Sequence, residues 1–355
     1  MASMSGTRRE FLRRQLGPVF LGACGLGLTE APLTAHEREH GDLVSLSRTA
    51  MACRFEILLP EGDGRALGAA QEALALADDL ERQMTIFRED SEISRINREA
   101  VCAPVEVEAR LFGLLDLAAR LAAETAGAFD ITGGPLSRLW RSCRREGRLP
   151  TADEIESARA AVGMSHVRLD PERRTVAFAC ENVGLDLGAI GKGHALDRIC
   201  EQLRAEGVTD ALVHAGHSSI AAMGCPAWDQ GWAVSIADAV GDSPRPQVRL
   251  HDQCMATSGS GQQFYEVAGK RYGHIIDPRA GWPAEGVLSA TAIAPTAAEA
   301  DALATAFYIM GMEATKAYCE KHPGVGAVMI CPGEAAGAAR VAGAGMSEAL
   351  LEVPV

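Results

Sequence analysis

The sequence is poor in aromatic residues and in basic charge, and its cysteines lack metal-binding spacing. Aromatic residues make up 5% of the 355 residues, and Asp and Glu outnumber Lys and Arg by 47 to 34. The resulting net charge of −13 disfavours binding of nucleic acid through a basic surface. None of the ten cysteines falls in a C-x-x-C pair, so neither a zinc cluster nor a redox motif is indicated. Most cysteines are expected to be buried as small apolar residues.

Long apolar runs are also missing, because the apolar segment over residues 16–28 is too short to span a bilayer. Arg8 and Arg9 precede it, so residues 1–35 are expected to be a twin-arginine export leader that directs the protein to the periplasm. Cys24 follows a Leu-Gly-Ala sequence that resembles a lipoprotein processing site and would carry a lipid anchor. A competing cleavage site ends at Ala35. Without the leader, which carries four arginines against two glutamates, the net charge is −15.

Residues 45–355 are expected to form a single domain of the α+β class. Apolar periodicity predicts helices over residues 65–84, 107–126, 152–162, 191–206 and 296–311, with Thr151 as one N-cap. Strands are predicted over residues 51–59, 167–169 and 175–179, a charged loop over 85–97, and mainly β-structure over 211–272. Strands and helices do not alternate regularly, which favours antiparallel sheets over a doubly wound parallel sheet.

An acid and a hydroxyl lie one helical turn apart near the C-terminal end. Asp301 and Thr305 have the spacing i and i+4, which places both oxygens on one face of the predicted helix. Carboxylate and alcohol oxygens are hard donors that suit Mg²⁺. Taken alone, an Asp near a helix start is more often a cap or a partner of the helix dipole.

A glycine-rich loop over residues 184–193 joins an apolar strand to a predicted helix. Its glycines let backbone N–H groups face a ligand, the helix start favours an anion, and Lys192 adds a positive charge. The loop, which contains Asp186, is a candidate pyrophosphate cradle, although it matches neither a P-loop nor a G-x-G-x-x-G motif. A tight turn with a solvated lysine explains the pattern equally well.

Hydroxyls, a histidine and an acid follow one another over residues 256–278. Thr257, Ser258 and Gly259 come first, and His274 is a candidate general base that Asp277 would orient, or beside which Asp277 would help to hold a metal. A lone histidine is more often a structural residue.

Taken together and in this order, the segments resemble the ApbE family, the FAD:protein FMN transferases. The matching stations are Met51 with Phe55, residues 90–97, residues 127–132 with Pro135 and Trp140, residues 186–193, residues 256–259, residues 274–278 with Gly281, and residues 300–305. The resemblance implies an α+β scaffold, related to the T-fold, of antiparallel sheets with packed helices. It also implies transfer of FMN from FAD, as substrate, to a Ser or Thr of an acceptor flavoprotein, with release of AMP.

The resemblance also implies roles for individual residues. It assigns Mg²⁺ to Asp301, Thr305 and the backbone carbonyl of Ala189, and catalysis to His274, Asp277 and Lys192. Contacts with FAD are implied for Met51, Phe87, Asp130, Thr132, Asp186, Lys192, Thr257, Ser258 and Gly259. The expected acceptor is a subunit of a membrane redox complex.

The sequence departs from the family pattern at three stations. His217 replaces the second glycine of a Gly-Gly pair, Phe87 replaces a phenolic aromatic residue, and Ala52 replaces a glycine after Met51. Zinc binding by His214 and His217 is disfavoured, because two histidines in a turn are usually polar surface. Two other functions stay open: an FAD diphosphatase that uses water as the nucleophile, and a flavin-binding protein without catalysis.

Overall fold

The computed structural model describes residues 43–61, 64–226, 229–236, 246–259, 264–267, 269–333, 338–346 and 351–352. Contacts group residues 41–355 into one unit. The expected export leader and Cys24 lie outside the described residues. Among those residues, no helix has the length and apolar character needed to cross a membrane.

An eight-stranded sheet forms the centre of the fold, and every neighbouring pair of its strands is antiparallel. Its strands, in spatial order, are β1 (Leu43–Ala50), β2 (Cys53–Pro60), β6 (Ala211–Ala215), β7 (Ser219–Met223), β10 (Cys254–Gly259), β13 (Ser289–Ala294), β14 (Gly326–Pro332) and β15 (Ala339–Ala344). The central strand β13 is buried along its whole length, as expected for a strand covered on both faces. The expected α+β class with antiparallel sheets is confirmed.

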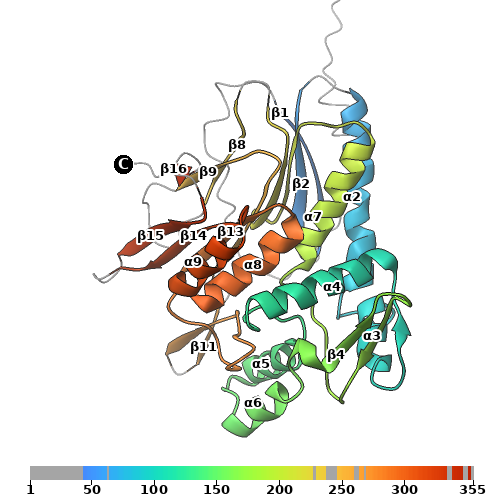
Figure 1. The fold of residues 1–355 in the computed structure, drawn as a ribbon, viewed down its shortest axis with the longest axis vertical. Coiled ribbons are helices and arrows are strands. Elements are labelled where there is room, and N and C mark those ends of the chain that lie inside the picture. The colour runs from blue at the N-terminus through green and yellow to red at the C-terminus, as the bar shows by residue number, and fades with distance from the viewer. Residues whose placement is uncertain are drawn as a thin grey trace, which may run out of the picture. The chain divides into compact units, whose positions relative to one another are not determined.

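Helices cover one face of this sheet (Figure 1). They are α2 (Gly64–Met84), α7 (Gly191–Ala205), α8 (Ala297–Met310) and α9 (Met312–Lys321), with α4 (Ala109–Glu124) packed on α8. Ten of the 14 residues of α8 are buried, most of them alanines. Such small side chains let α7 and α8 approach each other and the sheet closely.

The other face of the sheet packs against a second, three-stranded sheet. Its strands are β8 (Trp232–Ser235), β9 (Gln247–Leu250) and β16 (Leu351–Glu352). Trp232 and Val248 meet Ile220, Met255 and Ile293 in a separate apolar cluster. The eight-stranded sheet therefore has one face covered by helices, the helical face, and one covered by the second sheet, the β face. Successive side chains along a strand point alternately to these two faces.

The remaining elements are small. They are α3 (Glu92–Glu99), α5 (Gly134–Glu146), α6 (Ala152–Arg159), a 3₁₀ turn (Met164–His166), the sheet of β3 (Val105–Glu106), β4 (Val167–Asp170) and β5 (Thr175–Phe178), and the hairpin of β11 (Phe264–Val267) and β12 (Lys270–Gly273). The predicted cap at Thr151 is confirmed, because its hydroxyl accepts from the Glu154 N–H and Glu154 closes a capping box.

Several elements differ from the sequence-based expectations. The charged segment 85–97 contains α3, which is capped by Ser91 and anchored by the buried Ile93 and Ile96. Strand β1 and helix α9 were not predicted, and the strand expected from Met51 begins only at Cys53. Met51 and Ala52 instead form a two-residue turn between β1 and β2, both with positive φ.

Candidate active site

Helix α8 is fixed at its N-terminus by side chains from within and from α7. The Thr296 hydroxyl caps the helix by accepting from the Glu299 N–H. The carboxylate of Asp197, on α7, accepts from the N–H groups of Ala297 and Ala298 at 2.8 and 2.9 Å. Burial raises the pKa of Asp197 to about 6, and the two N–H groups act in the opposite direction.

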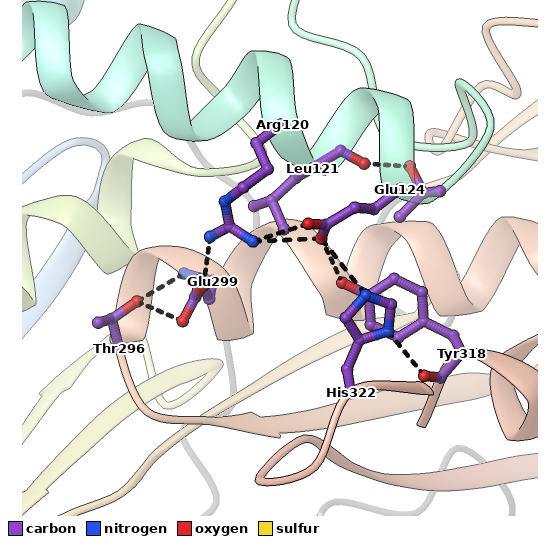
Figure 2. A network of polar contacts seen from close by, with 8 residues as sticks. Arg120, Leu121, Glu124, Thr296, Glu299, Tyr318 and His322 are labelled. Atoms are coloured by element: carbon purple, nitrogen blue, oxygen red, sulfur yellow. Dashed lines mark hydrogen bonds and ion pairs between the residues drawn. The ribbon is translucent and has the colours of Figure 1, made fainter. Parts of the chain in front are cut away.

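A polar network joins the outer side of α8 to α4 and α9 (Figure 2). Arg120 on α4 pairs with Glu124 on its own helix and with Glu299 on α8. Glu124 also accepts from the Tyr318 hydroxyl at 3.0 Å, and His322 stacks on the Tyr318 ring at 3.9 Å between centroids. Helix α8 is thus held by α7 through Asp197 and by α4 through Arg120, and these contacts restrain the first turns of α8, which carry Asp301 and Thr305.

Asp301 lies at the junction of α7, α8 and β7, and its side chain is 7% exposed. One carboxylate oxygen accepts from the Ser219 hydroxyl at 2.7 Å and lies 3.4 Å from the Lys192 ammonium. The other oxygen accepts from the Gly193 N–H at 3.0 Å. Lys192 and Asp301, which are 109 residues apart in sequence, are thus brought together by the packing of α7 on α8.

Ser219 was not identified from the sequence, although it contacts Asp301 directly. It is the first residue of β7 and is fully buried. A hydroxyl at the end of an apolar strand could have indicated this contact, because a buried hydroxyl needs a hydrogen-bond partner.

Gly193 sets the distance between α7 and α8. A Cβ atom at this position would lie 2.0 Å from the carbonyl oxygen of Ala297. Only glycine permits this approach, and the approach is what allows the Gly193 N–H to reach Asp301.

Thr305 lies one turn after Asp301, on the same face of α8. Its hydroxyl is 3.1 Å from the hydroxyl of Ser258 on β10, so these two predicted residues also meet. Thr257 instead pairs with Thr291, with 2.8 Å between the hydroxyl oxygens. Because side chains alternate along a strand, Thr257 points to the β face while Ser258 points to α8. Gly259 ends β10 beside the backbone of Leu288.

The glycine-rich loop is held by backbone and amide contacts. The side-chain amide of Asn97 exchanges hydrogen bonds with the N–H and carbonyl of Leu185, at 2.7 and 2.9 Å. The Asp186 N–H donates to the carbonyl of Ile131 at 2.7 Å. The Asp186 carboxylate accepts from the Gly188 N–H at 3.0 Å and shapes the turn that presents the half-buried Ala189.

The loop leads into the N-terminus of α7, where Ile190 at the N-cap position provides no side-chain cap. The Gly193 N–H of the first turn donates to the Asp301 carboxylate, and the positive end of the helix dipole favours a further anion there. Lys192, whose side chain is 25% exposed, adds its charge in the first turn. A phosphate group is the ligand that such an arrangement suits.

Asp130 and Thr132 form a tight clamp on a neighbouring loop. One Asp130 oxygen accepts from the Thr132 N–H and hydroxyl at 2.8 and 2.6 Å, and the other accepts from the Met164 N–H at 3.1 Å. The Thr132 hydroxyl accepts from the Gly163 N–H at 2.6 Å, and Thr132 is fully buried. These bonds show a structural role, and direct contact of the two side chains with a nucleotide stays a prediction.

His274 and Asp277 lie on the segment that follows β12. His274 is exposed, as a group that takes a proton from an incoming molecule must be. The Asp277 carboxylate makes a bidentate pair with Arg279 at 2.9 and 2.8 Å and accepts from the Arg279 N–H. The expected role of Asp277 in orienting His274 therefore stays a prediction.

Phe87, the station expected to stack on a flavin, is 79% exposed. The Arg141 guanidinium lies 5.1 Å from the centre of its ring. Stacking of this exposed ring on a flavin stays a prediction.

The departures at Ala52 and His217 occupy turn positions that favour glycine. Both residues have φ of 58°, in the left-handed region where a side chain costs roughly 1 kcal/mol or more. His217 compensates in part by stacking on His214, with 4.4 Å between the ring centroids.

His214 lies beside a buried carboxylate, an arrangement that was not predicted from the sequence. Its Nε2 atom lies 3.3 Å from the Glu56 carboxylate, and the two residues face each other across β2 and β6. This imidazole, with the Ser45 hydroxyl and Arg54, lowers the pKa of Glu56 to about 2. Both side chains point to the β face, away from Asp301.

The donor set around Asp301 fits one hard divalent cation only in part. It offers one carboxylate and the hydroxyls of Thr305 and Ser258, which are oxygen ligands suited to Mg²⁺. Across the described part of the chain, no group of three or more His, Cys, Asp or Glu side chains could hold a metal ion. The chemistry matches a magnesium ion that arrives with phosphate oxygens and keeps some of its water, and not an all-protein metal cage.

Comparisons with known proteins agree with this architecture. The sequence profile of the ApbE family matches residues 51–329. An FAD:protein FMN transferase from Treponema pallidum is 31% identical over 334 residues, which is 90% of this chain and 91% of that protein. One from Haemophilus influenzae is 31% identical and covers 79% of this chain and 84% of its own length.

Solved structures give the same result. The crystal structure of the ApbE protein from Thermotoga maritima superimposes with a TM-score of 0.74 at 29% identity, over 84% of this chain and 96% of that chain. The flavin transferase ApbE from Vibrio cholerae gives a TM-score of 0.74 at 28% identity, over 85% and 97% of the two chains. With the family profile covering most of its length, the chain belongs to the ApbE family.

Proposed function

We propose that the protein is an FAD:protein FMN transferase that cleaves FAD and attaches FMN through a phosphoester to a Thr or Ser hydroxyl of an acceptor flavoprotein. The observation that carries the proposal is the junction of α7 and α8. There the Asp301 carboxylate, the hydroxyls of Thr305 and Ser258, and the Lys192 ammonium lie near the N-terminus of α7. This combination suits a pyrophosphate together with a hard cation.

The residues of the chain divide the work of the reaction. Lys192 and the N-terminus of α7 bind the pyrophosphate of FAD, while Phe87 stacks on the isoalloxazine ring. His274 takes the proton of the acceptor hydroxyl as its oxygen attacks the phosphorus on the FMN side. A new P–O bond forms, the bond from that phosphorus to the bridging oxygen breaks, and AMP leaves with the bridging oxygen.

Asp301, Thr305 and the carbonyl of Ala189 would hold Mg²⁺ in this site. When bound there, the ion neutralises charge on the pyrophosphate and stabilises charge that develops in the transition state. Asp301 also holds α8 against α7 through its bond to Gly193, and against β7 through its bond to Ser219.

An FAD diphosphatase is the second candidate function. It would use the same residues with water in place of the acceptor hydroxyl, and it is favoured by the solvent exposure of His274. The two functions differ in whether AMP release depends on the acceptor.

The proposal is tested by incubating the protein with FAD, Mg²⁺ and an acceptor subunit that carries a Thr-containing target segment. A flavin-labelled acceptor band under denaturing conditions, together with AMP in equal amount, is the expected result. His274→Gln should lower the labelling rate at least about 100-fold, whereas the exposed Asp153→Ala should leave it unchanged. AMP release that is equally fast without acceptor would establish the diphosphatase instead.

Export by a twin-arginine leader and action in the periplasm complete the proposal. A membrane redox subunit is the proposed acceptor, and Cys24 the proposed point of lipid attachment. Metabolic labelling with a fatty acid, compared between the full chain and Cys24→Ala, tests the anchor.

A further inference from the structure

A cavity of about 360 Å³ lies between α4, α7 and the start of α8. One wall is apolar and includes Leu114, Leu117, Ala222 and Pro295. The opposite wall is a polar face of α7, where His194, Arg198, Glu201 and Arg204 follow one another at helical spacing. None of Asp301, Thr305, Lys192 or His274 lines this cavity, so it is separate from the candidate active site.

One polar atom of this wall is buried without a hydrogen-bond partner among the described residues. It is the Nε atom of Arg198. His194, one turn before Arg198 on the same face of α7, is 6% exposed. Buried polar groups are nearly always satisfied, so an unpartnered guanidinium N–H in the wall of a cavity indicates a missing ligand or ordered water.

The lining carries three arginines and three acids. The carboxylates of Asp197 and Asp252 accept from backbone N–H groups, and Glu201 pairs with Arg198. Arg110 and Arg204, in contrast, form no ion pair with a carboxylate within the described parts of the chain. Burial lowers the pKa of His194 to about 4, so at neutral pH its ring serves as a neutral hydrogen-bond donor.

We propose that this cavity is a second binding site, which takes a small organic anion with one phosphate or carboxylate group. The anionic group lies against Arg198 and His194, with Arg110 and Arg204 at the rim, and the apolar part lies against Leu114 and Leu117. The volume falls within the range of small-molecule sites.

The walls of the cavity are held rigidly, as a binding site requires. The ion pairs of Arg120 with Glu124 and Glu299 tie α4 to α8 (Figure 2). Thr296 connects this network with the cavity, since it caps α8 and also lines the cavity. Ligand binding therefore needs no rearrangement of the helices.

Gly113 provides a direct test. It lines the cavity, and a Cβ atom there would meet no atom within 4 Å. Gly113→Leu should fill the site without disturbing the helix. Gly68→Leu is the matched control, because Gly68 is also a helical glycine with open space around its Cβ position and does not line the cavity.

The probe is phenyl phosphate, titrated by calorimetry into protein saturated with FAD, so that the nucleotide site is occupied. We expect a dissociation constant of about 1 mM or tighter for the wild type and for Gly68→Leu, and binding at least about tenfold weaker for Gly113→Leu. Inorganic phosphate and phenol, titrated separately, should each bind more weakly than phenyl phosphate, because each lacks one half of the proposed contacts.

A charge variant checks the polar half without altering the cavity volume greatly. Arg110→Gln combined with Arg204→Gln should weaken binding about three- to tenfold, whereas Arg144→Gln, an exposed arginine on α5, should not change it. The inference is overturned if the wild type gives no saturable binding, or if Gly113→Leu and the double arginine variant both bind phenyl phosphate as the wild type does.

Discussion

Gly193→Ala is the substitution that most directly tests how the candidate active site is assembled. The added Cβ atom would lie 2.0 Å from the Ala297 oxygen, 2.4 Å from the Ala297 carbonyl carbon and 2.7 Å from the Ala298 nitrogen. These are backbone atoms, so no flexible side chain can move aside. Helices α7 and α8 must therefore separate by about 1 Å or more to restore ordinary contact distances.

The separation has a cost that follows from the contacts at the junction. It lengthens the 3.0 Å bond from the Gly193 N–H to Asp301 and the two bonds from Asp197 to α8. A hydrogen bond to a charged group contributes about 1.5–3 kcal/mol, while the gain in helix propensity from Gly to Ala returns at most about 1 kcal/mol. The free energy of unfolding should fall by roughly 2–4 kcal/mol, and the midpoint of thermal unfolding by roughly 5 °C or more.

Differential scanning calorimetry measures this change, and the FMN-transfer assay measures its effect on Asp301. A displacement of about 1 Å should lower the transfer rate about 100-fold. Gly68→Ala, in open space on α2, is the control and should raise the free energy of unfolding by about 0.5–1 kcal/mol. If Gly193→Ala is as stable and as active as the wild type, the close approach of α7 and α8 is not what positions Asp301.

Three further predictions concern Asp301, Glu56 and Ala52. Asp301→Ala should lower the rate of FMN transfer at least about 100-fold. It should also lower the midpoint of thermal unfolding, because Lys192, Gly193 and Ser219 lose their common acceptor. Ser219→Ala should lower the rate and the midpoint much less, and equal decreases for the two variants would contradict this ranking. The pKa of Glu56 is lowered to about 2 in the folded protein, so its contribution to stability is present above its ordinary pKa and is lost as the pH falls towards 2. Glu56→Gln should therefore lose up to about 3 kcal/mol at pH 7 and show a flatter dependence between pH 4.5 and 2 in urea denaturation, and parallel curves would argue against the pairing with His214. Ala52→Gly should raise the urea midpoint by an amount equivalent to about 1 kcal/mol, because φ is 58° there, while Ala50→Gly in the adjoining strand should lower it.

The spacing of residues along the chain was sufficient to predict several local features. Apolar periodicity located α2, α7 and α8 to within a few residues, and Thr151 was correctly identified as a cap because its preference is set within one helical turn. The i and i+4 spacing of Asp301 and Thr305 likewise placed both on one face of α8. Helix α3 was missed because its eight residues are mostly polar or charged, and only Ile93 and Ile96 are buried.

Contacts between distant segments could not be predicted in the same way. Asp197 has the appearance of an ordinary surface acid within a helical pattern, yet it binds the start of a helix a hundred residues later. His214 and Glu56 become a pair only because β2 and β6 are neighbours in the sheet. The positive φ at Ala52 and His217 explains why glycine is the residue expected at these stations, which the sequence alone recorded only as departures.

The sequence by itself determined the class of the fold and the kinds of chemical group available, because helix periods, caps and glycine-rich turns depend on residues close together in the chain. The tertiary structure decided which of those groups meet. Packing of α7 against α8 through Gly193 brings Lys192 and Ser219 to Asp301, and strand alternation sends Ser258 towards Thr305 but Thr257 to the opposite face. Such meetings depend on the distances between elements and on the faces they present, which no local pattern in the chain encodes.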